Sequence, residues 1–180
     1  DALSLIFLPL IVYPLFVASG LRFEGAPDPL WIIAGQVVAF FIINDTIFYW
    51  SHRLLHTPTL FKKIHFLHHK FRYVQPISVQ YAHPIENGFA LLAFFAGPLI
   101  FDTHFVTLAI WVLFRFVETM DAHSGYAFPF SPSGERHAFH HMAIHSNFGS
   151  LWSPWDRLLK TDLPYRDWVE GGRVGAPKPL

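Results

Sequence analysis

The sequence predicts an all-α integral membrane protein. We expect a bundle of about four transmembrane helices, arranged as two hairpins, with a cytosolic helical cap that holds a histidine-rich site for two metal ions. Three observations lead to this expectation. Apolar residues make up 52% of the 180 residues and charged residues only 14%, against roughly 25% charged residues in an ordinary soluble domain. The apolar residues fall into four segments, and 12 histidines gather mainly in the polar stretches between them.

Composition excludes several classes of site and partner. The chain has no cysteine, which excludes disulfides, thiolate-ligated haem, iron–sulfur clusters and cysteine-type zinc fingers. Its 13 basic and 13 acidic side chains balance, so nothing indicates a nucleic-acid partner. The length fits a single domain over residues 1–180.

The first membrane hairpin is expected in residues 1–50. It combines an apolar segment at 5–19 with a second at 30–50, joined by a turn at 20–29 that contains glycine and proline. The second segment is close to the roughly 20 residues that span a bilayer.

The second membrane hairpin is expected in residues 88–120. Its segments, 88–101 and 104–116, are shorter, and each alone would also fit a buried core helix or a half-span. Gly97-Pro98 and Asp102-Thr103 interrupt the apolar run, which predicts the turn of a helical hairpin there.

The two remaining stretches, 51–87 and 121–180, are polar and rich in histidine. Residues 51–83 carry five basic residues and no acidic one, and the tail from Ser131 carries six more basic residues. The positive-inside rule places both stretches in the cytosol and both hairpin tips on the other side. The alternative is a soluble all-helical protein with a phenylalanine-rich core.

Eight histidines form three clusters at helical spacing. One cluster is a pair four residues apart, and the other two are triples with offsets of 0, 3 and 4. Such offsets place the rings on one face of a helix, and the repeated triple predicts metal binding rather than isolated surface histidines. The clusters are His52 and His56; His65, His68 and His69; and His137, His140 and His141.

This number of imidazoles exceeds what one ion needs, because a tetrahedral zinc site takes four ligands. Two ions with open coordination positions would use them. Imidazole suits iron, copper, zinc and nickel alike, so the ligand type leaves the metal open. No Glu-x-x-His is present, which distinguishes the chain from the carboxylate-bridged di-iron bundles. The imidazoles must be neutral to bind, so binding should fail at low pH.

Further residues are expected around this centre. His123, at the cytosolic end of the fourth apolar segment, is a predicted ligand, and His83 is either a ligand or a residue behind the ligands. His104 and His145 are expected to lie outside the site. For Asp45 and Glu118, a buried ion pair with Arg53 or Arg115 is the alternative. Groups that orient the ligating imidazoles are expected among Asp45, Glu86, Glu118, Asp121, Asn147 and Asp156.

In this order, the motifs resemble those of the fatty acid hydroxylase / sterol desaturase superfamily of membrane di-iron enzymes. The resemblance covers roughly residues 40–165, and within the superfamily the chain most resembles the C-4 methylsterol oxidases. The motifs are D-x-x-x-Y-W-x-H-R-x-x-H from Asp45 to His56, H-x-x-H-H from His65 to His69, A-H-P-x-E from Ala82 to Glu86, and H-x-x-H-H from His137 to His141. The family's usual N-Y-[GA] is Asn147-Phe148-Gly149 here.

The resemblance implies an O2-dependent enzyme with two iron ions that oxidises an unactivated methyl group of a lipid. The lipid would be a C-4 methylsterol or a related sterol or terpenoid; a fatty acyl hydroxylase or desaturase is the alternative within the superfamily. Electrons would come from NAD(P)H through a separate cytochrome b5-type carrier or reductase. The protein would reside in the endoplasmic reticulum of a eukaryote, or the inner membrane of a bacterium, with its active site facing the cytosol.

Two other classes of function stay open at this point. A hydrolase or isomerase could use the same imidazoles with zinc, and it would act without O2. A non-catalytic metal- or sterol-binding membrane protein could keep the scaffold without turnover. The complete set of histidine clusters argues against the non-catalytic protein, because a binder has no need of open coordination sites.

Overall fold

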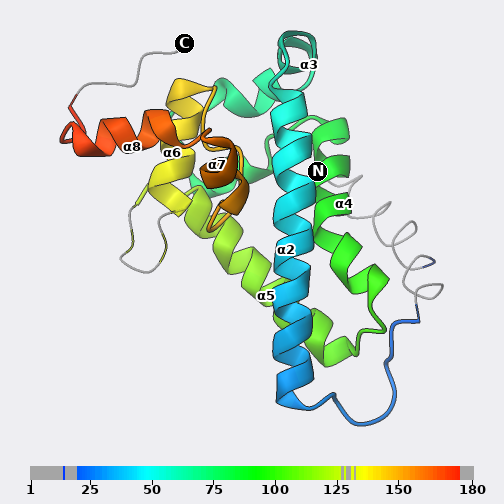
Figure 1. Cartoon of the computed structure of the whole chain (residues 1–180). Coiled ribbons are helices and arrows are strands. Elements are labelled where there is room, and N and C mark those ends of the chain that lie inside the picture. The colour runs from blue at the N-terminus through cyan, green and yellow to red at the C-terminus, as the bar shows by residue number, and fades with distance from the viewer. Residues whose placement is uncertain (1–13, 15–19, 127, 129–130, 132, 175–180) are drawn as a thin grey trace.

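The structure is a computed structural model, and it describes residue 14, residues 20–126, residues 128 and 131, and residues 133–174. This part of the chain is helical and contains no β-strand, only two isolated β-bridges. The all-α prediction is therefore confirmed (Figure 1). The elements are α2 (Leu30–Leu55), α3 (Pro58–Lys63), the 3-10 helices η1 (His65–Lys70) and η2 (Pro76–Gln80), α4 (Pro84–Ile100), α5 (Phe105–Ala122), α6 (Ser133–Ala143), α7 (Pro154–Leu159) and α8 (Leu163–Glu170).

Helix α2 is the long axis of the molecule (Figure 1). It has 26 residues, it follows Pro29, and it carries the second apolar segment into the first histidine pair, with His56 as its C-cap. Among the described residues, α2 is the one helix long and apolar enough to cross a membrane by length and composition. The apolar segment predicted at 5–19 lies, apart from Pro14, outside the described residues.

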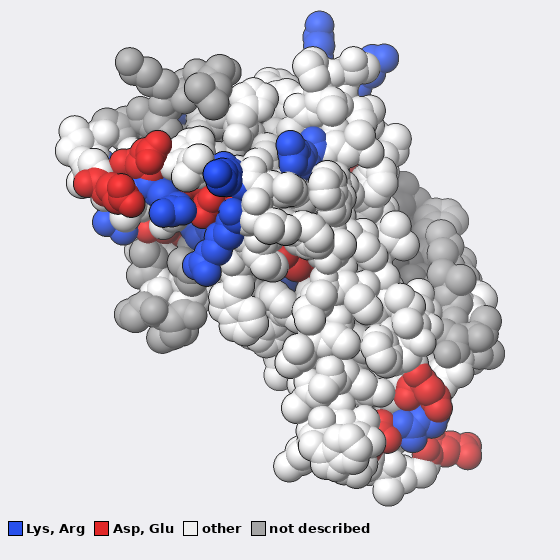
Figure 2. Space-filling model, in the orientation of Figure 1, with Lys and Arg blue, Asp and Glu red and all other residues white. Residues whose placement is uncertain are grey.

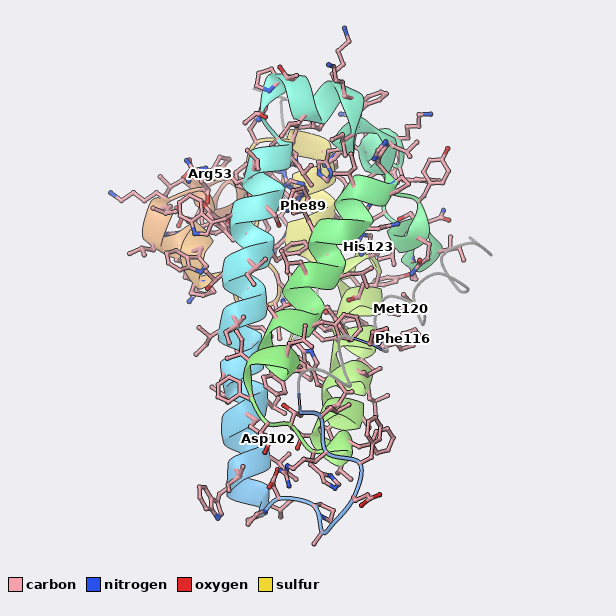
Figure 3. All side chains as sticks on the ribbon, turned by 90° about the vertical axis from the view of Figure 1, so that its right-hand side faces the viewer. Arg53, Phe89, Asp102, Phe116, Met120 and His123 are labelled. Carbon is pink, nitrogen blue, oxygen red and sulfur yellow. The ribbon has the colours of Figure 1, made fainter. Side chains whose placement is uncertain are left out.

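Helices α4 and α5 form the predicted hairpin, with the turn at Asp102-Thr103. Gly97-Pro98, also predicted to interrupt the run, lies inside α4 instead. Both helices begin with a histidine cap: the Nδ1 atom of His83 accepts from the backbone N–H of Ile85 at 3.2 Å, and that of His104 accepts from Val106 at 3.1 Å. Such caps satisfy backbone donors that a helix start leaves free. Asp102 lies in the turn between the two helices, at the end of the molecule opposite His123 (Figure 3).

The three long helices meet in an aromatic core. Phe40 and Trp111 are fully buried, and their rings lie 5.8 Å apart. The indole N–H of Trp111 donates to the carbonyl of Phe94 at 2.9 Å, which ties α5 to α4. Gly97 of α4 faces Phe40 of α2 so closely that an added Cβ would lie 2.9 Å from the Phe40 Cα atom. Small size at this one position lets α2 and α4 pack side by side.

Helices α6, α7 and α8, which we call the cap, gather beside the C-terminal half of α2 (Figure 1). Two polar contacts fasten the cap to α2. The indole N–H of Trp155 donates to the Thr46 hydroxyl at 3.0 Å, and the hydroxyls of Tyr49 and Thr161 lie 3.1 Å apart. These contacts bring α6 next to the end of α2 that carries the first histidine pair.

Candidate metal centre

The structure brings nine histidines together in two adjacent groups. Within each group, one candidate ligand atom per residue lies within 4.8 Å of all the others. The groups touch, since the rings of His69 and His141 are 4.5 Å apart and stacked. Group one is His52, His56, His65, His69 and His140; group two is His68, His123, His137 and His141.

Each predicted histidine triple is divided between the two groups. In the first triple, the middle residue His68 enters group two while its neighbours enter group one. In the second, the middle residue His140 enters group one while its neighbours enter group two. The first triple lies on the 3-10 helix η1 and the second on the α-helix α6. Side chains three and four residues apart on a helix project in nearby but distinct directions. One short helix can therefore supply imidazoles to both groups.

Four of the imidazoles are held by backbone carbonyls. A carbonyl only accepts a hydrogen bond, so the Nδ1 atom facing it must carry the proton, and the Nε2 atom of the same ring keeps a free lone pair. The Nδ1 atoms donate as follows: His52 to Phe148 O at 2.8 Å, His140 to Ser146 O at 2.6 Å, His141 to Phe71 O at 2.9 Å and His123 to Thr119 O at 3.1 Å.

In group one, the Nε2 atoms form a chain of contacts that protons alone cannot satisfy. His52 contacts His65 at 3.1 Å, His65 contacts His69 at 3.0 Å, and His69 contacts His140 at 3.2 Å. The two ends of this chain carry lone pairs, because their protons sit on Nδ1. The two middle atoms are Nε2 of His65 and Nε2 of His69. If both carried protons, the protons would face each other. If only one carried a proton, two lone pairs would meet elsewhere in the chain of contacts. A cation among these nitrogens resolves the conflict.

Group two has the same conflict at His137. Its Nε2 atom lies 3.0 Å from Nε2 of His123 and 3.1 Å from Nε2 of His141. Both neighbours present lone pairs, since their protons sit on Nδ1. One proton on His137 points at only one of them, so a cation again suits the arrangement better than any set of protons.

Burial and charge favour the same conclusion. Both ring nitrogens of His56 are buried without a hydrogen-bond partner. Burial lowers the pKa of His68 to about 3, and the nearby His123 acts in the same direction. Burial also lowers the pKa values of the other group members on η1 and α6: His65, His69, His137, His140 and His141. The rings are therefore neutral near pH 7, as metal ligands must be. The residues present fit a pair of imidazole-bound ions.

Two of the predicted carboxylates support the imidazoles. Glu86 Oε2 lies 2.9 Å from Nδ1 of His65, and burial raises the pKa of Glu86 to about 8. Asp156 acts through the backbone: it accepts from the N–H groups of Phe148 at 2.9 Å and Gly149 at 2.8 Å. It thereby holds the loop whose Phe148 carbonyl fixes His52.

The other four residues predicted to orient the imidazoles contact other groups. Their hydrogen-bond and ion-pair partners belong to the helices, to Ser131 ahead of α6 and to the 144–153 loop. Asp45 accepts from the N–H of Ser150. Glu118 pairs with Arg115 at 2.5 Å, as the ion-pair alternative predicts. Asp121 accepts from the hydroxyls of Ser131 and Ser133, and the Asn147 amide donates to the Arg136 carbonyl.

Three histidines lie outside both groups. His83, predicted as a ligand or as a residue behind the ligands, uses Nδ1 to cap α4. His104 caps α5 in the same way at the far end of the hairpin. His145 is exposed, with its ring 6.3 Å from that of His56.

Sequence reasoning missed the four carbonyls that fix the imidazoles. They belong to Phe71, Thr119, Ser146 and Phe148. Backbone groups carry no residue-type signal, so only the tertiary structure shows them. For Phe148 a partial signal exists, because it stands within the Asn147-Phe148-Gly149 motif.

Comparison with known proteins gives a family match and several relatives. A family model described as fatty acid hydroxylase matches residues 37–161. Very-long-chain aldehyde decarbonylase GL1-11 of Oryza sativa subsp. indica is 39% identical over 174 residues, covering 89% of this chain and 65% of the relative. Methylsterol monooxygenase 1 of Danio rerio is 40% identical over 146 residues, covering 76% and 50%. C-4 methylsterol oxidase erg25 of Schizosaccharomyces pombe is 34% identical over 172 residues, covering 86% and 56%.

The chain thus spans less than two thirds of the length of these three relatives. No solved structure matches the chain.

Proposed function

The chain belongs to the fatty acid hydroxylase family, and from this membership we propose that it is an O2-dependent oxidoreductase that oxidises an unactivated C–H bond of a lipid with two iron ions. The observation that carries the proposal is the pair of adjacent imidazole groups, whose facing lone pairs call for cations. Group one would hold one ion and group two the other. When bound, the iron pair supplies the O2-activating redox chemistry that no side chain can perform.

The chain's own residues orient the ligands and keep water away. The four carbonyl bonds orient four of the imidazole rings, and Glu86 lies beside a fifth, that of His65. Such contacts are the usual way in which a protein sets the direction of metal ligands. Two phenylalanines cover group one: the Phe148 ring lies 5.1 Å from that of His56, and the Phe61 ring lies 5.4 Å from that of His69. Such an apolar wall limits side reactions with water.

The proposed substrate is a lipid with an unactivated methyl group, first of all a C-4 methylsterol or a related sterol or terpenoid. Relatives named methylsterol monooxygenase and C-4 methylsterol oxidase, at 34–40% identity, support this choice. A very-long-chain aldehyde is the second candidate, because relatives named aldehyde decarbonylase are 39% identical. A fatty acyl hydroxylase or desaturase is the further alternative within the family.

We propose that the bundle spans a membrane through two hairpins, residues 1–50 and 88–120. In support, α2 is long and apolar enough to cross, and large apolar side chains project outward from both α2 and α5, as Ile42 (61% exposed) and Leu113 (65% exposed) do. On the face in Figure 2, Lys, Arg, Asp and Glu gather at the two ends, with few between them. The basic stretches place the histidine end in the cytosol, at the endoplasmic reticulum or a bacterial inner membrane.

Oxidation with O2 needs electrons from outside the site. The proposed donor is a separate cytochrome b5-type carrier or reductase that draws on NAD(P)H.

The test is oxygen-dependent turnover of a defined lipid. The iron-loaded protein in lipid nanodiscs receives a reductase system and a C-4 methylsterol, a very-long-chain aldehyde or a fatty acyl lipid, under oxygen-18 gas or under argon. We expect labelled oxygen in the sterol product, no product under argon, and no product with His68→Ala or His140→Ala. The matched control His145→Ala removes an exposed histidine next to group one and should stay active. Turnover under argon, or turnover that survives both ligand changes, would refute the proposal.

A further inference from the structure

A second feature of the cap is a surface pocket lined by arginines, away from the two histidine groups. It lies between α6, α7 and α8, offers about 460 Å³ of space, and is lined by Arg136, Arg157, Asp162, Tyr165 and Arg166. We call it the arginine pocket. Basic and acidic side chains gather over this part of the face in Figure 2. The volume suits a small ligand or a headgroup.

The arginine pocket contains one buried and incompletely paired guanidinium. The Arg136 side chain is only 8% exposed, and its Nη2 atom has no hydrogen-bond partner. Its nearest carboxylate oxygen, Oδ2 of Asp156, is 3.7 Å away, beyond hydrogen-bond length. A buried charge without full pairing is costly, so a missing partner is indicated.

Asp156 forms an ion pair with Arg136 but no hydrogen bond to it, because its oxygens are directed at other donors. Oδ1 accepts from the Phe148 N–H at 2.9 Å and from the Thr161 hydroxyl at 2.7 Å, and Oδ2 accepts from the Gly149 N–H at 2.8 Å. The carboxylate therefore serves mainly the 148–149 loop and Thr161, and Nη2 of Arg136 keeps a donor without a hydrogen bond.

The outer wall adds two more positive charges. Arg157 and Arg166 are exposed, and within the part of the chain that the structure describes neither has an ion pair. Asp162 is the one carboxylate of the lining. Tyr165 donates its hydroxyl hydrogen to Glu135 at 2.7 Å, so its ring closes one side without offering a donor.

We propose that the arginine pocket binds a phosphate-class oxyanion, with Arg136 as the buried ligand and Arg157 and Arg166 as the outer ones. A guanidinium presents its donors in a planar fork that matches phosphate oxygens. The three guanidinium groups give the lining a net positive charge against the single carboxylate of Asp162, which is buried and whose Oδ1 atom has no hydrogen-bond partner. The site is separate from the histidine centre and does not depend on the proposed oxidation.

The same oxyanion can come from free phosphate or from a phospholipid headgroup. The position suits a headgroup, because α7 lies against the stretch of α2 that ends at Trp50, and the Trp50 and Trp155 rings are 6.0 Å apart. Trp152 and Leu158, which flank α7 or belong to it, are exposed. Tryptophans of this kind collect at membrane–water interfaces.

The experiment measures binding of three phosphorus probes to the purified full chain in neutral detergent. The probes are inorganic phosphate, dihexanoyl phosphatidic acid and dihexanoyl phosphatidylcholine, each followed by calorimetry and phosphorus NMR. The test variant is Arg157→Gln/Arg166→Gln, which changes exposed side chains only. The matched control Lys62→Gln/Lys63→Gln removes the same charge from exposed positions on α3. Arg136→Gln is added where thermal unfolding shows a folded protein.

We expect saturable binding of phosphatidic acid and a loss of at least about tenfold in affinity for the arginine variant, with the lysine control unchanged. If inorganic phosphate binds as tightly as phosphatidic acid, the free anion is sufficient as the ligand. If phosphatidic acid binds and inorganic phosphate does not, the ligand is the lipid headgroup. Both results support the site. Binding that is equally strong in the arginine variant, as phosphate held at the metals would be, overturns the proposal. Absence of saturable binding by the wild-type chain overturns it as well.

Discussion

The contact between α2 and α4 at Gly97 predicts a destabilising effect from a single methyl group. In Gly97→Ala, the new Cβ would lie 2.8 Å from Cδ1 and 2.9 Å from Cα of Phe40. Carbon atoms in good contact lie about 3.5–4.0 Å apart. The Phe40 ring can rotate away, but its Cα atom belongs to the backbone of α2. The two helices must therefore separate by about 0.6–1 Å.

The size of the effect follows from two opposing terms. Overpacking of this kind costs about 1–3 kcal/mol, and contact with a backbone atom places it in the upper half of that range. Alanine gains about 1 kcal/mol over glycine in a helix interior. The net prediction is a loss of about 1–2 kcal/mol of unfolding free energy. Gly88→Ala in the same helix is the control, because nothing lies within 4 Å of its Cβ position, and it should gain about 0.5–1 kcal/mol.

Thermal unfolding in detergent, followed by tryptophan fluorescence, measures the difference. A change of 1 kcal/mol shifts the Tm of a chain of this size by about 2–4 °C. We expect Gly97→Ala to melt below wild type and Gly88→Ala above it, about 3–12 °C apart. If both substitutions raised the Tm equally, α2 and α4 would not pack as closely as described.

Three further predictions concern the metal centre. Glu86→Gln should lower metal affinity by about tenfold, because Glu86 contacts Nδ1 of His65; equilibrium dialysis measures this, with exposed Glu170→Gln as the unchanged control. Asp156→Ala leaves two loop N–H groups without an acceptor and should cost about 2–6 kcal/mol in denaturant unfolding; a cost below about 1 kcal/mol would contradict the role of the carboxylate. In metal-free protein, the pKa of His68 is lowered from 6.5 to about 3, so below pH 6.5 only the unfolded chain takes up that proton. The unfolding free energy should therefore decrease as the pH is lowered below about 6.5, by up to about 1.4 kcal/mol per pH unit for each such histidine. Denaturant midpoints that do not change between pH 7.5 and 5.5 would contradict this.

Much of the fold follows from the sequence because its signals are local. Apolar length predicts α2, and the break at 102–103 predicts the turn that the structure shows between α4 and α5. The break predicted at Gly97-Pro98 is wrong, because α4 continues through both residues. The four-span arrangement stays a proposal, since its first segment falls outside the described residues.

The histidine centre follows from the sequence only in part. Spacing predicts which imidazoles share a helix face, but not which partner each one meets across the fold. His68 and His140 therefore join groups that their sequence neighbours do not. His83 shows the opposite case: its motif neighbour Glu86 reaches the centre, whereas its own ring turns back to cap α4. The arginine pocket gave no sequence signal, because Arg136, Arg157 and Arg166 are unremarkable members of a basic tail until α6, α7 and α8 converge.

The most direct test of the central claim is the number of metal ions per chain. Protein from iron-supplemented cells is analysed by elemental mass spectrometry as wild type, as His68→Ala/His140→Ala, which removes one ligand from each group, and as the control His145→Ala. The two-group arrangement predicts about two iron ions per chain in wild type and control, and their loss from the double variant in a protein that remains folded. A folded wild-type chain without stoichiometric metal, or a double variant that retains both ions, would contradict it.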